Sequence, residues 1–182
     1  MLDTLGSFII GGLLLLNLLG LNFTLSSHNQ ALSSGHISQS TADQLMVVIQ
    51  DDFRKIGYKV SNQVPILRFD STQVVFLGDL NDDGAVDLVV YRQSDTTAVP
   101  QTPNPHDRYL YRDVNGMSRK IALGVVRFWL AGYTELGQKT TTLQNIRTIE
   151  VALEVEATDP IGDAYNRAIR RARISPVALQ SK

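Results

Sequence analysis

The chain has 182 residues, a formal net charge of −1, 43% hydrophobic residues and no cysteine. The near-neutral charge gives no basic footprint for nucleic acid, and the lack of cysteine excludes disulfides and thiolate metal sites. With about 30 residues set aside for an apolar N-terminal segment, about 150 residues remain, which is enough for one domain with a sizeable core.

The N-terminal stretch from Leu5 to Leu25 is strongly apolar, and no Asp, Glu, Lys or Arg occurs from Thr4 to Ala42. Its apolar run, Leu5 to Phe23, is close to the ~20 residues that cross a ~30 Å hydrocarbon layer as a helix. The stretch predicts a membrane helix or a helix buried in a bundle of helices. A helix buried in a soluble core is the alternative, although an all-round apolar helix at a terminus needs cover on every side.

The flanks of this stretch argue against a cleaved signal peptide. No Lys or Arg precedes it, and the exit Thr24-Leu25-Ser26-Ser27 is a poor small-residue cleavage site. We therefore expect an uncleaved anchor, or a chain already trimmed at its N-terminus.

The segment from Thr41 to Tyr58 has the clearest pattern of a soluble helix. Gly57 lies where a C-terminal cap is expected. The apolar residues that share one face at three- and four-residue steps are Leu45, Val48, Ile49, Phe53 and Ile56. The uncharged segment before it, Ser26 to Ser40, is either a flexible linker or a continuation of the helix. In the second case one rod of roughly 75 Å runs from Leu5 to Ile56.

Beyond Gly57 the sequence changes to short runs rich in β-branched and aromatic residues. The predicted strands are Ile66 to Phe69, Gln73 to Leu77, Val86 to Tyr91, Arg108 to Val114, Lys120 to Tyr133 and Ile146 to Ala157. Sequential strands joined by short turns, such as Asn115-Gly116, favour antiparallel pairing. The last run alternates strictly, which predicts one face on a core and one face in water. The sequence therefore predicts an α+β fold, in which a long N-terminal hydrophobic helix precedes an antiparallel β-sheet domain.

Two segments outside these strands are predicted to be exposed. The loop from Thr96 to Asp107 contains three prolines, and the tail from Tyr165 to Lys182 carries four arginines, which indicates a solvated surface. The chain then divides into an apolar helix at 1–27, an amphipathic continuation of that helix at 28–57 and a β-rich head at 58–182.

The one sharp local motif is the run from Gly78 to Asp87. Asp79, Asn81, Asp83 and Asp87 stand at positions one, three, five and nine of a calcium loop, with Gly84 at the bend and the Ala85 carbonyl at position seven. Position twelve is Val90 where an EF-hand has Glu, and the flanks are strand-like, so this is not an EF-hand. The run predicts either a hairpin loop that binds Ca2+ or a plain β-turn, which favours the same residues.

No catalytic constellation is present in the sequence. His28, His36 and His106 are scattered, and neither a nucleophile motif nor a phosphate-binding glycine loop appears. The pair Asp51-Asp52 has Arg54 and Lys55 close by, which indicates surface charge. We expect the chain not to be an enzyme.

The order of these parts resembles type IV pilin-like proteins, and more narrowly the PilW-type minor pilins and the J-type minor pseudopilins of type II secretion. The matching features are the apolar N-terminal helix, the helix ending from Asp51 to Tyr58, the hairpin from Val75 to Arg92, and a late strand at Ile149 to Leu153 followed by an arginine-rich tail. The family's processing site and its glutamate at mature position five are absent, so Asp3 is the nearby acid.

This resemblance implies a structural subunit of a filament. Its helix would be held in the bacterial inner membrane, with the head outside the cytoplasm, and would pack in an extracellular filament after assembly with other pilin-like subunits, of the same or another kind. The resemblance implies that Asp3 pairs with a neighbour's N-terminal amine. The alternative is a permanently anchored extracytoplasmic binding module that uses the calcium-loop hairpin. No nucleic-acid partner is expected.

Overall fold

A computed structural model describes residues 2–61, 63–99, 101–160 and 164–180, without the side chains of residues 2–10, 30 and 31. The elements in chain order are α1 (Leu2–Arg54), β1 (Ile66–Phe69), β2 (Gln73–Gly78), β3 (Asp87–Gln93), the 3-10 turn η1 (Thr96–Ala98), β4 (Leu110–Val114), β5 (Met117–Ala122), β6 (Val125–Tyr133), β7 (Lys139–Thr140), the 3-10 turn η2 (Leu143–Asn145), β8 (Thr148–Glu156), β9 (Arg167–Ile174) and α2 (Val177–Gln180).

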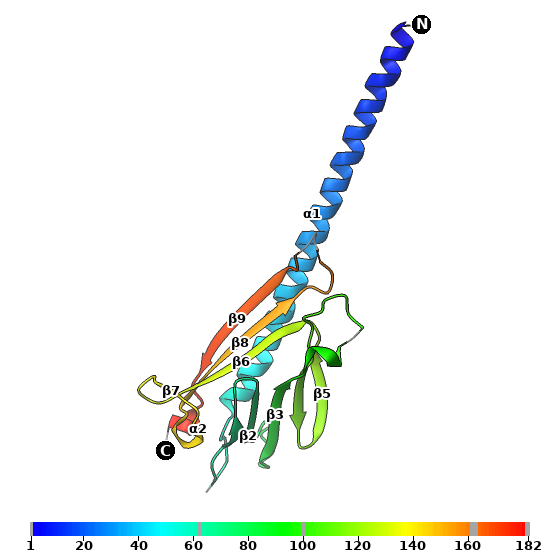
Figure 1. The fold of residues 1–182 in the computed structure, drawn as a ribbon. Helices are drawn as coiled ribbons and strands as arrows, with labels where there is room; N and C mark the ends of the chain where they lie inside the picture. Colours follow the sequence, from blue (N-terminus) through cyan, green and yellow to red (C-terminus); the bar gives the residue numbers. More distant parts are fainter. Residues whose placement is uncertain (1, 62, 100, 161–163, 181–182) are drawn as a thin grey trace.

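Helix α1 is continuous over 53 residues, so the uncharged segment between residues 26 and 40 is helical and not a linker. Two of its hydroxyl groups bond within the helix, since Ser38 donates to the Ser34 carbonyl and Ser27 donates to the Thr24 carbonyl. Helix α1 ends at Arg54, three residues before the predicted cap at Gly57. Gly57 has the left-handed φ expected of a cap, 80°, but its N–H donates to the Leu77 carbonyl of β2. Figure 1 shows the N-terminal half of α1 extending away from the rest of the molecule.

The apolar stretch from Leu5 to Leu25 begins outside the side chains that the structure describes. Among the described residues, no helix is long and apolar enough to cross a membrane.

One stripe of the C-terminal half of α1 is buried. Its apolar members are Ala42, Leu45, Met46, Ile49 and Phe53, with Ile56 buried just beyond the end of the helix. The predicted face is confirmed except at Val48, which is 42% exposed. Successive residues of a helix are about 100° apart, so Val48 lies beside the stripe and not on it. Met46, which the sequence prediction left out, lies on the stripe.

The strands form two antiparallel sheets, one ordered β1-β2-β3-β4-β5 and the other β7-β6-β8-β9. This confirms antiparallel pairing, with two sheets in place of the single one expected. The predicted strand from Lys120 to Tyr133 is divided between β5 and β6, because Gly124 turns the chain at a φ of 84°. In β8 the predicted alternation is confirmed, with Ile149, Val151 and Leu153 fully buried.

The arginine-rich tail forms an edge strand, β9, that lies against both β8 and α1. Its arginines remain partly exposed, as predicted, but three of the four form ion pairs. Arg167 and Arg173 bind Glu154 and Glu150 of β8 at 2.5 and 2.6 Å, and Arg170 binds Asp43 of α1 at 2.5 Å. The tail therefore joins the second sheet to the helix.

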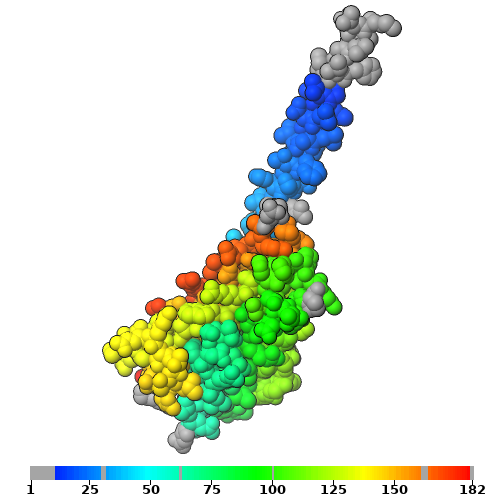
Figure 2. Space-filling model, in the orientation of Figure 1, coloured from blue at the N-terminus to red at the C-terminus, as the bar shows by residue number. Residues whose placement is uncertain are grey.

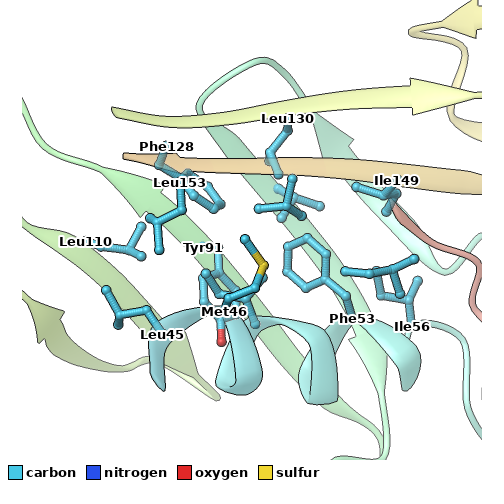
Figure 3. Packing of buried hydrophobic residues seen from close by; sticks show 14 of the residues in the cluster. Leu45, Met46, Phe53, Ile56, Tyr91, Leu110, Phe128, Leu130, Ile149 and Leu153 are labelled. Atoms are coloured by element: carbon cyan, nitrogen blue, oxygen red, sulfur yellow. The ribbon is translucent and has the colours of Figure 1, made fainter. Parts of the chain in front are cut away.

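The core lies between α1 and the two sheets (Figure 3). The two sheets and their connections form the head. Phe53 of α1 contacts Phe76 and Tyr91 edge-on, at ring-centre distances of 5.7 and 5.4 Å. Tyr91 in turn stacks on Phe128 of the second sheet at 6.4 Å. These aromatic contacts link helix and both sheets in one core.

A buried carboxylate fixes the end of α1 on the first sheet. Asp52 accepts hydrogen bonds from Arg112 Nε at 2.5 Å, Arg112 Nη2 at 3.1 Å and Tyr91 Oη at 2.6 Å. The interpretation as surface charge is right for Asp51, whose side chain is 64% exposed beside Arg54, and wrong for Asp52. Burial and the Asp52 charge raise the pKa of Tyr91, and the hydrogen bond to Asp52 raises the pKa of Arg112.

The variant Arg112→Leu tests this anchor. It leaves the buried Asp52 without its cation, so we expect a loss of about 3 kcal/mol in the free energy of unfolding, measured by urea denaturation. Tyr91→Phe removes one hydrogen bond to a charged group and is expected to cost about 1.5 kcal/mol. The matched control is Arg54→Leu, which breaks an exposed pair and should cost less than about 1 kcal/mol. Equal losses for Arg54→Leu and Arg112→Leu would contradict the anchoring role.

Candidate functional site

The acidic run predicted as a calcium loop connects β2 and β3. These strands pair up to Gly78 and Asp87, so the flanks are extended as predicted. Within the loop Asp82 and Gly84 have left-handed φ angles of 62° and 90°. Glycine adopts such angles without strain, which explains the bend at position 84.

The predicted ligands at the centre of the loop accept hydrogen bonds from the loop itself. Asp83 accepts from the Ala85 N–H at 2.7 Å and from the Asn81 side chain at 2.8 Å. The side-chain oxygen Oδ1 of Asn81 accepts from the Asp83 N–H at 3.4 Å. Ala85 is exposed. These short-range bonds are the ones that stabilise turns formed by Asx residues.

The predicted ligands at the ends of the loop are more buried. Asp79 is fully buried, and its Oδ2 accepts from the Gly84 N–H at 2.8 Å. Asp87 accepts from the Leu80 N–H at 3.0 Å and from the Asn115 side chain at 2.7 Å. Asn115, predicted only as a turn residue, therefore ties the β4–β5 hairpin to this loop.

Sequence reasoning missed Lys59, which supplies a positive charge to the loop. Its ammonium donates to Asp79 Oδ2 at 2.9 Å and also to Asp82. The Tyr58 hydroxyl donates to Asp82 at 3.2 Å, and the Lys55 ammonium donates to the Leu80 carbonyl. No spacing in the sequence points to these contacts, because they join residues that are 20 to 25 positions apart.

The electrostatics of the loop follow from these contacts. Burial disfavours the charged form of Asp79, but the hydrogen bonds from Lys59 and the Gly84 N–H outweigh it and hold its pKa below the ordinary value. The hydrogen bond from Lys59 likewise lowers the pKa of Asp82, and the hydrogen bonds to Asp82 and Asp79 raise the pKa of Lys59. The loop is therefore a charged cluster in which Lys59 opposes the carboxylates.

Within the part of the chain that the structure describes, no three His, Asp or Glu side chains lie close enough together to hold a metal ion. Calcium also takes carbonyl and amide oxygens, which a group of His, Asp and Glu side chains leaves out. Calcium binding by the loop therefore stays a prediction. Asp3, the predicted assembly residue, lies in the first turns of α1, and its side chain is outside the described residues.

A second polar cluster joins the proline-containing loop to the end of β8. Asn104 donates to Glu156 at 3.1 Å and to the Ala157 carbonyl at 3.2 Å, and the His106 ring lies 3.3 Å from the same Glu156. Asn104 and Asp107 are both 1% exposed and Val99 is 5% exposed, so the prediction of an exposed loop is wrong at these three residues.

Asp107 is the unusual member of this cluster. Neither of its carboxylate oxygens has a hydrogen-bond partner among the described residues. Burial raises its pKa, the nearby Thr102 hydroxyl opposes that shift, and the charge of Glu156 adds to it. The fold therefore makes the charged form of this carboxyl group less favourable than it is in an exposed Asp.

No protein-family model matches the chain, and no curated protein matches it.

The variant Asp107→Asn tests the cost of this buried carboxyl group. Because its pKa is raised, its stabilising contribution is complete below the ordinary value of 3.8 and is lost as the pH rises through the folded-state value. Asp107→Asn keeps the shape without the charge, so it should be more stable than the wild type at neutral pH. The difference in the free energy of unfolding between the two proteins should shrink as the pH is lowered toward 3.8.

The measurement is urea denaturation of both proteins over this pH range. The control Asp51→Asn changes an exposed carboxylate, and its stability should follow the wild type at every pH. An Asp107→Asn protein that is less stable than the wild type at neutral pH would show that the charged carboxylate is favourable in the fold.

Proposed function

We propose that this protein is a structural subunit of a filament of the type IV pilus or pseudopilus kind, held in a membrane by α1 before assembly and packed through α1 afterwards. The observation that carries the proposal is the bare N-terminal half of this helix. Every described side chain from Gly11 to Asn29 is exposed, and Figure 2 shows this part protruding from the head. Contact with the head begins at Ser34 and Gly35, which meet Asn166.

The protruding helix presents more apolar surface than a lone soluble chain tolerates. Its exposed side chains are Leu13, Leu14, Leu15, Leu16, Leu18, Leu19, Leu21, Phe23 and Leu25. Burying one such side chain is worth about 1.5–3 kcal/mol, so a strong force favours covering them. Lipid tails and neighbouring copies of the helix both provide apolar cover. When the helix moves from lipid into a filament, it therefore exchanges one apolar environment for another.

Two polar side chains of the protruding helix bond to carbonyl groups of the helix itself. Asn17 donates to the Leu13 carbonyl at 3.0 Å and Thr24 donates to the Gly20 carbonyl at 2.9 Å. Uncharged groups satisfied within the helix are compatible with lipid and with a helix bundle. This supports a helix that is buried on all sides in its working state.

The head half of α1 has an uncovered side as well. Ile37, Val47 and Val48 are 64%, 57% and 42% exposed, while the opposite stripe is buried by the sheets. In a filament of parallel copies this side would face a neighbour. We infer other pilin-like subunits as partners, an inner-membrane location with the head outside the cytoplasm, and an extracellular filament after assembly. The expectations of no enzymatic activity and no nucleic-acid partner stay predictions.

A permanently anchored binding module is the second candidate. The observation that favours it is the charged loop beside Tyr58 and Lys59, at the end of α1 remote from the protruding half. A partner is free to reach this loop without help from the helix. Filament incorporation distinguishes the two candidates, since only a subunit leaves the membrane.

Deletion of residues 1–27 tests the role of the bare helix. It removes no described contact with the head, so the head should fold as a soluble monomer, whereas the full chain should require detergent. Size-exclusion chromatography and circular dichroism measure both properties. A full chain that stays monomeric in plain buffer would contradict the proposal.

Incorporation into filaments tests the subunit role. We expect the wild-type protein in the filament fraction sheared from its native cells. Leu16→Lys places a charge in the apolar helix at a cost of about 2.5–3.5 kcal/mol and should reduce incorporation at least tenfold. Asp3→Ala should also reduce incorporation while the head stays folded, because a lone carboxylate in an apolar bundle needs a partner.

The matched control for that experiment is Leu136→Lys in the β6–β7 turn, where the native side chain is 84% exposed. Its incorporation should equal that of the wild type. Absence of the wild-type protein from sheared filaments, with the protein present in the membrane fraction, would favour the anchored module.

A further inference from the structure

We propose that the Lys59 ammonium is the resident cation of the loop from Asp79 to Asp87, and that a calcium ion binds this loop only by displacing it. This proposal concerns the loop alone and does not depend on the filament. It assigns Lys59 the role that the sequence pattern assigns to the metal.

The first argument is the place of the ammonium. In the calcium pattern Asp79 stands at position one, so an ion in the loop would bind its carboxylate. Lys59 already lies on that carboxylate at 2.9 Å from Oδ2 and bridges to Asp82. The Asp79 side chain is fully buried, whereas that of Lys59 is 38% exposed. An uncompensated buried carboxylate is costly, and Lys59 supplies the compensating charge.

The second argument is the state of the other oxygens. Calcium needs six to eight oxygen ligands that converge on one point. Here the oxygens of Asp83 and Asp87 accept from N–H groups of Ala85, Asn81, Leu80 and Asn115, as described above. Among the described residues, Asp79 Oδ1 is buried without a hydrogen-bond partner. A metal ion that binds the Asp79 carboxylate through Oδ2 would have to displace Lys59 and draw the oxygens of Asp83 and Asp87 away from their donors.

The third argument is that the backbone delivers Lys59 to this point. The Gly57 N–H donates to the Leu77 carbonyl at 2.8 Å, and the Asp79 N–H donates to the Tyr58 carbonyl at 3.1 Å. A Cβ at Gly78 would lie 2.2 Å from the Lys55 carbonyl oxygen, so only glycine permits this approach. Lys59 itself has a left-handed φ of 57°, an uncommon angle that persists where surrounding contacts hold it.

The charged and polar groups facing the ammonium come from both neighbouring segments. The loop contributes Asp79 and Asp82, and the helix exit contributes Tyr58, whose ring centre lies 5.2 Å from Lys59 Nζ. The second cation of the helix exit, Lys55, bonds the Leu80 carbonyl instead. Removing Lys59 should therefore leave the carboxylates without compensation, which is the condition under which a calcium ion becomes favourable.

The test compares thermal unfolding of the full chain in non-ionic detergent, with millimolar calcium or with chelator, for the wild type and Lys59→Met. Methionine is unbranched and close in length to the alkyl part of lysine, so it removes the ammonium group and its hydrogen bonds to Asp79 and Asp82 with little change in bulk. We expect Lys59→Met to lower the Tm by several degrees in chelator and calcium to restore most of that loss. The wild-type Tm should respond much less to calcium.

Three controls sharpen the result. Lys120→Met removes a positive charge from β5 and should give neither effect. Magnesium, which demands a tighter octahedral site, should restore less than calcium does. In the Lys59→Met background, Asp83→Ala should abolish the calcium response by removing a ligand.

Two outcomes would overturn the proposal: an unchanged Tm of Lys59→Met in chelator, or an equal calcium response in the wild type and Lys59→Met.

If Lys59→Met does not fold in chelator, the double variant Lys59→Met with Asp79→Asn takes its place. Both charges are then gone, so it should fold without calcium and ignore added calcium. A double variant no more stable than the single one would show that Lys59 does not act as the counter-ion of Asp79.

Discussion

The position of the whole head on its helix depends on one buried carboxylate. Asp52 stands on the buried stripe of α1 and binds Arg112 of β4 and Tyr91 of β3 at once. Tyr91 is also the aromatic residue that contacts both Phe53 and Phe128. The polar anchor and the aromatic core therefore share a side chain, and the helix cannot slide along the sheets without breaking both. Because α1 is a single rod, this contact also sets the direction in which the bare half leaves the head.

The second sheet holds the same helix by different means. Its edge strand β9 binds α1 through Arg170 and Asp43, and Asn166 reaches Ser34 near the upper limit of the head. These contacts are partly exposed and are individually weak. The apolar stripe and Asp52, by contrast, are buried against the sheets. The result is a rod that is firmly held on one side for half its length and bare elsewhere.

The parts of this fold that follow a local pattern were predictable from sequence. The stripe of α1, the alternation of β8, the left-handed Gly57 and the Asn115-Gly116 turn each depend on residues close in the chain. Asp52 was predictable in principle, since it lies three residues after Ile49 and four before Ile56, on the buried face. Its partner Arg112 is 60 residues away, and Lys59 and Asp79 are 20 apart. Such pairings depend on how the sheets pack on the helix, which no local pattern records. The same holds for the burial of Asn104 and Asp107.

In the proposed filament subunit, neighbouring copies of the chain cover the bare half of α1. Cysteine cross-linking in cells tests this most directly, because the chain contains no cysteine of its own. A single cysteine at Leu16 or Leu19 should give disulfide-linked dimers, while one at Leu136, on the exposed β6–β7 turn, should give few. The yield of dimers should vary with the position of the cysteine around the helix. Absence of dimers from every position on the bare half, in cells where the protein is present at normal levels, would contradict the proposed subunit role.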